Sequence, residues 1–84
     1  MKRIYFSTHA RQQMAERGAS QSEVIETIRG GRSVPAKRGR QGFRRSFPYN
    51  RSWSGRTYGT KQVLAIIAEQ PDRLIVVTVY TFYF

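Results

Sequence analysis

The spacing of apolar residues predicts helices in the first part of the chain and strands in the second. Up to about residue 29, apolar residues recur at the period of a helix, and from residue 32 onward they alternate or run together, as in strands. We therefore expect an α+β fold of two layers, with two N-terminal helices packed on one face of a roughly four-stranded antiparallel sheet. The 84 residues are expected to form a single domain, residues 1–84.

The first predicted helix covers residues 8–17 and has a signal at each end. Ser7 or Thr8 can cap its start, because a hydroxyl accepts a hydrogen bond from a first-turn N–H that lacks a partner within the helix. Gly18 can end it, because glycine readily takes the left-handed conformation that follows many helices. The buried side is expected to carry Ala10, Met14 and Arg17, with His9 and Gln13 at its margin.

The second predicted helix begins with a capping box and runs to about Arg29. Ser20 and Glu23 are three positions apart, so each side chain is placed to accept a hydrogen bond from the backbone N–H of the other. Gly30 and Gly31 then end the helix. The buried side is expected to consist of Val24, Ile25 and Ile28.

The strand-like part of the chain is punctuated by turns. The expected strands, in chain order, are residues 33–37, 43–49, 62–68 and 73–82. A glycine-rich basic turn covers residues 38–42, and residues 50–55 form a polar loop that contains Trp53. The last two strands are continuously apolar and are expected at the centre of the sheet. A tight turn at residues 70–72 is expected to join them. Residues 3–6 are interpreted as an apolar plug beside the first helix, with a short strand as the alternative.

The last strand should present different side chains to its two faces, because successive side chains in a strand point in opposite directions. We expect the helices to cover Ile75, Val77 and Val79. Thr78 and Tyr80 then lie on the other face, where their hydroxyls are able to reach a ligand. The alternative is that both are ordinary strand residues, since threonine and tyrosine are enriched in sheets.

The charge of the chain indicates a polyanionic partner. There are 15 Lys and Arg residues against 5 Asp and Glu, for a net charge of +10, and no acid lies between Glu26 and Glu69. Nucleic acid is the commonest polyanion, and the preference for arginine suits planar recognition of phosphates and stacking on bases. An acidic protein partner, or a surface that is merely basic, remains an alternative.

Composition excludes several other kinds of site. The chain has no cysteine, so disulfides and thiolate zinc sites are excluded, and with one histidine and 5 acids we expect neither a metal site nor a cofactor. The apolar stretch at residues 74–84 is too short and too β-like for a membrane helix. No apolar run of secretory length follows the basic residues Met1-Lys2-Arg3, so the cytoplasm is the expected location.

His9 is the only histidine and the main candidate for acid–base chemistry. It lies in the first turn of its helix, where the positive end of the helix dipole opposes protonation and favours an imidazole that accepts a proton. The alternative is that His9 has a structural role, either in packing or in capping the start of the helix. Arg17 likewise has a structural alternative, with its aliphatic stem lying across the core.

The two ends of the chain resemble a family of small bacterial proteins. The pattern FSxHAxxxMxxRGxSxxEVxxxI at residues 6–28 is similar to the start of that family, and LIVVTVY at residues 74–80 is similar to its closing strand. The family is usually placed with the barnase–EndoU–colicin–RelE ribonucleases, which include many toxins of toxin–antitoxin pairs. The basic middle of the chain matches only in character.

The resemblance implies a RelE-like toxin that cleaves RNA without a metal and is inhibited by a small acidic antitoxin. In this interpretation a base helps the ribose 2′-hydroxyl attack the adjacent phosphate. The implied catalytic residues are His9 as base or acid, Arg17 at the scissile phosphate, Tyr80 as a proton donor or as a partner that orients His9, and Thr78 in support. The chain lacks a second histidine, so an arginine or tyrosine has to fill the second role.

Aromatic rings interleaved with arginines in the middle of the chain suit single-stranded RNA. The residues expected to contact RNA are Lys37, Arg38, Arg40, Arg44, Arg45, Arg51, Trp53, Arg56 and Lys61. Phe43 and Phe47 are instead expected in the core. Two other functions remain open from the sequence: a nucleic-acid-binding module without catalysis, and an interaction protein whose basic face meets an acidic chain.

Overall fold

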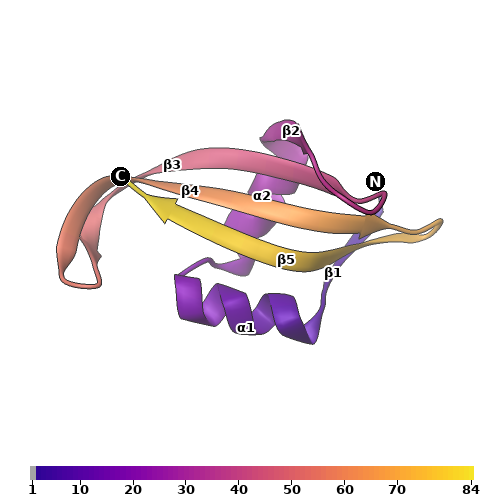
Figure 1. Cartoon of the computed structure of the whole chain (residues 1–84), viewed down its shortest axis with the longest axis horizontal. Coiled ribbons are helices and arrows are strands. Elements are labelled where there is room, and N and C mark those ends of the chain that lie inside the picture. The colour runs from indigo at the N-terminus through magenta and orange to yellow at the C-terminus, as the bar shows by residue number, and fades with distance from the viewer. Residues whose placement is uncertain (1) are drawn as a thin grey trace.

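In the computed structural model, which describes residues 2–84, five strands form one mixed sheet and two helices pack against it (Figure 1). Met1, the first residue of the basic start, lies outside the described residues. The elements are β1 (Arg3–Phe6), α1 (Thr8–Arg17), α2 (Gln21–Gly30), β2 (Arg32–Pro35), β3 (Gln41–Trp53), β4 (Arg56–Glu69) and β5 (Arg73–Tyr83). The strand order across the sheet is β1-β5-β4-β3-β2.

The α+β prediction is confirmed, but the expectation of a wholly antiparallel, four-stranded sheet is wrong. Residues 3–6 form the edge strand β1 and not an apolar plug. They pair in parallel with the start of β5, with Ile4 opposite Leu74 and Phe6 opposite Val76. The other neighbouring strands are antiparallel. Four residues are too few to show a strand period, so only the distant partner β5 reveals that this segment is a strand.

The helix ends predicted from the sequence are confirmed. Ser7 Oγ accepts a hydrogen bond from the Ala10 N–H at 3.0 Å. Gly18 follows α1 with a φ of 79° and donates its N–H to the Met14 carbonyl at 2.9 Å. In α2, the Ser20 and Glu23 side chains accept from each other's backbone N–H at 3.1 and 2.9 Å. These contacts join residues three or four positions apart, which is why the sequence alone reveals them.

Helix α1 lies along the edge of β5 that β1 leaves free, because β1 pairs only as far as Val76. The buried Gln13 side chain accepts from the Val79 N–H at 2.8 Å, and Arg17 donates to the Val79 carbonyl at 2.7 Å. Two polar side chains of α1 thus satisfy the backbone of β5 where a neighbouring strand is missing, as buried polar groups require. They also fix Arg17 against β5.

A bulge in β5 changes which of its residues face the helices. Ile66 of β4 pairs with Thr78 but Ile67 pairs with Val76, so Val77 is an extra residue in β5. Val76 and Val79 are both fully buried. The expectation that the helices cover Val79 is therefore confirmed. The same expectation for Ile75 and Val77 is wrong, because the extra residue changes the alternation of side chains between Val76 and Val79.

The core lies between the helices and one face of the sheet. Its fully or nearly fully buried members are Ala10, Met14, Ala19, Val24, Ile28, Val63, Ala65, Ile67, Val76 and Val79. On β4 the buried residues alternate with half-buried ones. The half-buried Gln62, Leu64 and Ile66 point away from the helices, and we call this side of the sheet the open face. Thr78 and Tyr80 lie on the open face, as expected, because they pair with Ile66 and Leu64.

The β3–β4 hairpin is longer than expected and projects beyond the helices (Figure 1). Residues 50–53, predicted as a polar loop, continue β3 after a register shift between Pro48 and Arg51. The turn itself is confined to Ser54 and Gly55, with φ angles of 50° and 83°. By contrast, the tight turn predicted at residues 70–72 is confirmed, with Gln70 N–H donating to the Arg73 carbonyl at 2.9 Å.

Candidate nucleic-acid interface

A shallow pocket of about 270 Å³ on the open face brings hydroxyl groups and cations together. Its lining consists of Ala36, Lys37, Arg38, Arg40, Ile66, Thr78 and Tyr80. We call it the hydroxyl pocket. Strand β5 supplies the two hydroxyls, β4 supplies the apolar floor, and the connection between β2 and β3 supplies the three cations. None of the lining residues is acidic.

The connection between β2 and β3 presents its cations through a tight turn. Arg38 and Gly39 have left-handed φ angles of 62° and 70°, and Arg40 N–H donates to the Lys37 carbonyl at 3.2 Å. The side chains of Lys37, Arg38 and Arg40 are all exposed. The glycine-rich basic turn predicted from the sequence is therefore present, and the fold places it against Thr78 and Tyr80.

The structure brings together Arg17 and Tyr80, two of the residues that the sequence interpretation implied as catalytic. The Arg17 guanidinium carbon lies 5.1 Å from the centroid of the Tyr80 ring, within the range of a cation–π contact. The same guanidinium is held by its bond to the Val79 carbonyl. Arg17 thus covers one side of the Tyr80 ring, while Tyr80 lines the hydroxyl pocket.

His9 is not brought to this pocket. It is exposed in the first turn of α1 and is not among the residues that line the hydroxyl pocket. Among the described residues, His9 forms no hydrogen bond, ion pair or ring contact. The expected contact between Tyr80 and His9 is therefore not found, because α1 turns this first-turn side chain toward solvent.

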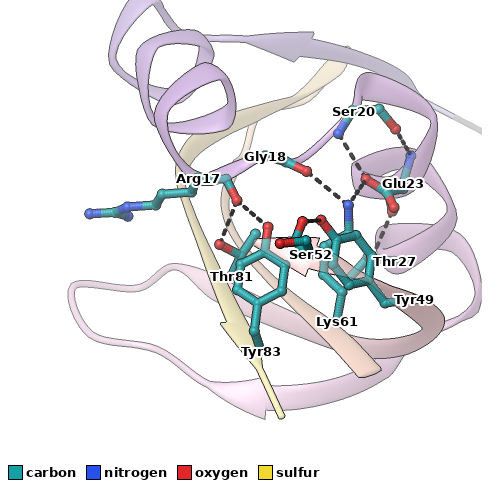
Figure 2. Close-up of polar contacts among 10 residues, drawn as sticks. All are labelled: Arg17, Gly18, Ser20, Glu23, Thr27, Tyr49, Ser52, Lys61, Thr81 and Tyr83. Atoms are coloured by element: carbon teal, nitrogen blue, oxygen red, sulfur yellow. Dashed lines mark hydrogen bonds and ion pairs between the residues drawn. The ribbon is translucent and has the colours of Figure 1, made fainter. Parts of the chain in front are cut away.

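Lys61 is buried, so the structure corrects its placement among the RNA contacts. Only 4% of the residue is exposed. Its ammonium group donates to Glu23 Oε1 and to the Gly18 carbonyl, each at 2.8 Å, as Figure 2 shows. The Tyr49 ring lies against it, with the centroid 5.3 Å from Nζ. A lysine held in this way ties the two helices to β4 and is not free to contact a ligand.

The Lys61 ammonium also acts on the ionisation of Glu23. Partial burial by itself would raise the pKa of the Glu23 carboxyl. The hydrogen bonds from Lys61 and from the Ser20 backbone, with the positive charge of Lys61, outweigh that effect and hold the pKa below its ordinary value of 4.5. Glu23 therefore carries its negative charge at neutral pH and balances the buried lysine.

Trp53 belongs to a packed aromatic cluster and not to an exposed loop, which corrects its expected role in stacking on RNA. Its ring stacks on Tyr83 with centroids 4.9 Å apart and planes 15° apart. Tyr49 and Tyr58 also contact Tyr83, at 5.2 and 5.8 Å between centroids. The Tyr83 hydroxyl donates to the Arg17 carbonyl at 2.6 Å (Figure 2), and burial raises the pKa of Tyr83. The cluster joins the projecting hairpin to the end of α1.

The remaining predicted arginines are divided between two places. Arg44 and Arg45 line a second basic pocket beside β2, together with Arg32. Arg51 and Arg56 lie in the projecting hairpin, outside both pockets, and Arg51 stacks on Tyr49 with 5.0 Å between its guanidinium carbon and the ring centroid. Arg32 was not predicted as a site residue. Its place in the stretch without acids between Glu26 and Glu69 is the sequence signal that it carries, whereas its position opposite Arg44 follows from the pairing of β2 with β3.

Within residues 2–84, no group of three or more His, Cys, Asp or Glu side chains is arranged to hold a metal ion. Helices α1 and α2 are each 10 residues long, and neither has the length or apolar character needed to cross a membrane.

A family model described as a domain of unknown function, DUF4258, matches residues 6–81. This match spans both helices and almost all of the sheet. No curated protein and no solved structure matches the chain. The chain belongs to the DUF4258 family.

Proposed function

We propose that this member of the DUF4258 family is a RelE-like endoribonuclease that cleaves single-stranded RNA at the hydroxyl pocket. The observation that carries the proposal is the meeting of Thr78 and Tyr80 with three cationic side chains on the uncovered face of the sheet. The resemblance of the two ends of the chain to a small bacterial family that is usually placed with the RelE-like ribonucleases supports the same activity.

The lining of the hydroxyl pocket suits a phosphodiester. Lys37, Arg38 and Arg40 supply three positive charges, and none of the lining residues carries a negative charge. Guanidinium groups donate pairs of parallel hydrogen bonds that match phosphate oxygens, and cations near a transferring phosphoryl group stabilise the charge that develops in the transition state. Ile66 forms an apolar floor on which a base or ribose rests.

In the proposed reaction the ribose 2′-hydroxyl attacks the adjacent phosphorus. The bond between O2′ and phosphorus forms, the bond between phosphorus and O5′ breaks, and a 2′,3′-cyclic phosphate and a free 5′-hydroxyl result. Tyr80 donates its phenolic proton to O5′, and the O2′ proton passes to solvent water, which then restores the tyrosine proton. The three cations stabilise the phosphorane, and Thr78 orients the phosphate with its hydroxyl.

Arg17 acts through Tyr80 in this proposal and is a positioning residue. Its guanidinium is held by the Val79 carbonyl at 2.7 Å and lies 5.1 Å from the Tyr80 ring centroid. This arrangement fixes the direction of the phenol. His9, which the sequence interpretation made the base, has no part in the step because it does not line the pocket.

The biological role that we propose is that of a toxin in a type II toxin–antitoxin pair. The net charge of +10 and the uncovered sheet face fit inhibition by a small acidic antitoxin that covers the hydroxyl pocket. RNA and the antitoxin would then compete for the same cations.

The second candidate is an RNA-binding module without catalysis. The position of His9 outside the pocket favours this alternative, because the chain has no other imidazole to move protons near pH 7. The two candidates share the same RNA-binding face and differ only in turnover.

Cleavage of a fluorescent single-stranded RNA by the purified protein, with a chelator present, separates these functions. We expect the wild type to release a 2′,3′-cyclic phosphate, and Tyr80→Phe to be slower by on the order of 100-fold with RNA affinity unchanged. Tyr5→Phe is the matched control, because Tyr5 is also exposed and also faces an arginine, Arg73, but lies outside the pocket. RNA binding without cleavage by the wild type would establish the binding module. Absence of RNA binding would overturn both candidates.

A further inference from the structure

We infer that a second pocket on the open face binds a phosphate of the RNA backbone at a distance from the point of cleavage. Its volume is about 310 Å³, and its lining consists of Arg32, Arg44, Arg45, Ser46 and Gln62. We call it the arginine pocket. The inference rests on the proposed binding of RNA, and it adds to that proposal the path that the strand follows.

The arginine pocket forms where strand β2 begins, because the outer edge of β3 beyond that point is unpaired. Within the described sheet, β2 pairs with β3 only from Gln41 to Arg44, whereas β3 continues to Trp53. Arg32 lies directly opposite Arg44, so both point to the open face. Arg45 also lines the pocket, but its side chain lies on the helix side of β3, where the guanidinium donates to the Glu26 carbonyl. The pairing of β2 with β3 therefore brings the guanidinium groups of Arg32 and Arg44 to one place on the open face.

These arginines have few partners within the protein. The bond that holds Arg45 is a long one of 3.5 Å to the Glu26 carbonyl at the end of α2, and its guanidinium carbon lies 5.4 Å from the Phe47 ring centroid. None of the lining residues is acidic. The positive charges of Arg32 and Arg44 repel each other unless an anion lies between them, so the pocket is electrostatically suited to an anion.

The neutral side chains of the pocket favour a phosphate over a carboxylate. Gln62 Nε2 donates to Ser46 Oγ at 3.2 Å, which leaves the Ser46 hydroxyl proton free to be donated to a ligand. The pocket thus offers the guanidinium groups of Arg32 and Arg44 and the Ser46 hydroxyl from several directions. A carboxylate has two oxygens in one plane, whereas the tetrahedral oxygens of a phosphate accept from all of these directions at once.

The arginine pocket and the hydroxyl pocket lie on the same face and share strand β4. Gln62 lines the first pocket, Ile66 lines the second, and Leu64 separates them on the same side of the strand. Four residues along a strand span about 13 Å, a distance that a few linked nucleotides cover. A single strand of RNA that follows β4 therefore places one phosphate in each pocket, with the intervening nucleotides over Leu64.

Binding of RNAs of two lengths tests this path, and it is measured in the Tyr80→Phe background, in which cleavage is slow. Arg44→Met removes the guanidinium while keeping an apolar stem, and Arg44→Lys keeps the charge without the fork. We expect Arg44→Met to weaken binding of an RNA of about eight nucleotides by about tenfold, and to leave binding of a dinucleotide unchanged. Arg44→Lys should restore part of the loss. Arg56→Met, in the projecting hairpin, is the matched control and should lose less than about twofold.

Titration with inorganic phosphate, observed through the arginine Nε–H signals in NMR spectra, tests the pocket without RNA. We expect the signals of Arg32 and Arg44 to shift and saturate together, with the signal of Arg56 unaffected. Parallel, non-saturating shifts at Arg56, or equal losses of RNA affinity in Arg44→Met and Arg56→Met, would overturn the inference. Saturable phosphate binding without RNA cleavage would refute the ribonuclease alone, and cleavage without saturable phosphate binding would refute the second site alone.

Discussion

Lys61 and Glu23 form a nearly buried ion pair, with Nζ 2.8 Å from Oε1, at the junction of both helices with the sheet. The same ammonium donates to the carbonyl of Gly18, the residue that ends α1, and Glu23 caps the first turn of α2. One side chain from the central strand β4 therefore sets the positions of both helices. This pair is the most buried ion pair among the described residues, and its lysine is a cation that the sequence alone wrongly predicts to contact RNA.

We expect Lys61→Met to lower the free energy of unfolding by about 2 kcal/mol, because it leaves Glu23 half-buried without its charge partner. The loss should be smaller than for a fully buried pair, since Ser20 still donates to the carboxylate. Urea unfolding followed by circular dichroism measures this. Arg56→Met, which removes an exposed cation from the same strand, is the control and should change stability by less than about 0.5 kcal/mol. Equal effects of the two substitutions would show that the pair contributes nothing.

We expect stability to fall in acid as Glu23 is protonated. Its pKa is lower in the folded protein than the ordinary value of 4.5, so its contribution is fully present above pH 4.5 and is lost as the pH falls through the folded value. The urea midpoint followed from neutral pH into the acid range measures this loss. Glu23→Gln should flatten the acid limb of the curve, whereas Glu69→Gln, which removes an exposed carboxylate, should change it less. An unchanged acid limb in Glu23→Gln would contradict the assignment.

We expect Gly18→Ala to be more destabilising than Gly55→Ala, although the two glycines have nearly the same backbone conformation. Their φ angles are 79° and 83°, so each alanine carries a similar left-handed cost of about 1 kcal/mol. A Cβ at Gly18 would lie 2.7 Å from Trp53 and from the Tyr83 hydroxyl, whereas a Cβ at Gly55 meets nothing within 4 Å. Overpacking should therefore add about 1–3 kcal/mol at Gly18 alone. Thermal unfolding of both variants measures the difference. Equal losses of stability would show that Trp53 and Tyr83 move aside without lowering the free energy of unfolding.

We expect Trp53→Ala to act on stability and not on RNA affinity. The substitution removes the ring stacked on Tyr83 and should cost about 2 kcal/mol, below the range for fully buried aromatic residues because Trp53 is half-buried. Unfolding is followed by circular dichroism, since Trp53 is the only tryptophan. RNA affinity is then compared at a temperature where both proteins are folded. A large loss of RNA affinity with unchanged stability would show that Trp53 contacts RNA in the proposed interface.

We expect His9→Ala to retain RNA cleavage within about threefold of the wild type, because the imidazole is outside the hydroxyl pocket. Stability should also be unchanged, since His9 is exposed. Single-turnover cleavage, measured beside Tyr80→Phe, tests this. Abolished cleavage in His9→Ala with full RNA binding would restore the histidine as the base and remove the mechanism based on Tyr80.

The features that the sequence by itself determined are those in which the interacting residues are close in the chain. The caps at Ser7 and Gly18, and the box formed by Ser20 and Glu23, depend on hydrogen bonds across one turn of helix. Such contacts need no knowledge of the rest of the fold. The turn at residues 70–72 was predictable for the same reason. The excess of positive charge and the absence of cysteine are likewise properties of composition alone.

The tertiary structure decided everything that depends on a distant partner. Residues 3–6 become a strand only because the edge of β5 is available, and the bulge at Val77 exists only in the register of β5 against β4. The sequence alone does not distinguish Lys61 from an exposed cation, because its partner Glu23 is 38 positions away and only the fold brings the two together. Because Lys61 is buried, it has a structural role and does not contact a ligand, since a charge removed from water has to be paired. The same long-range packing gathers Tyr80 with the basic turn, and Arg32 with Arg44, and so creates pockets that no local pattern contains.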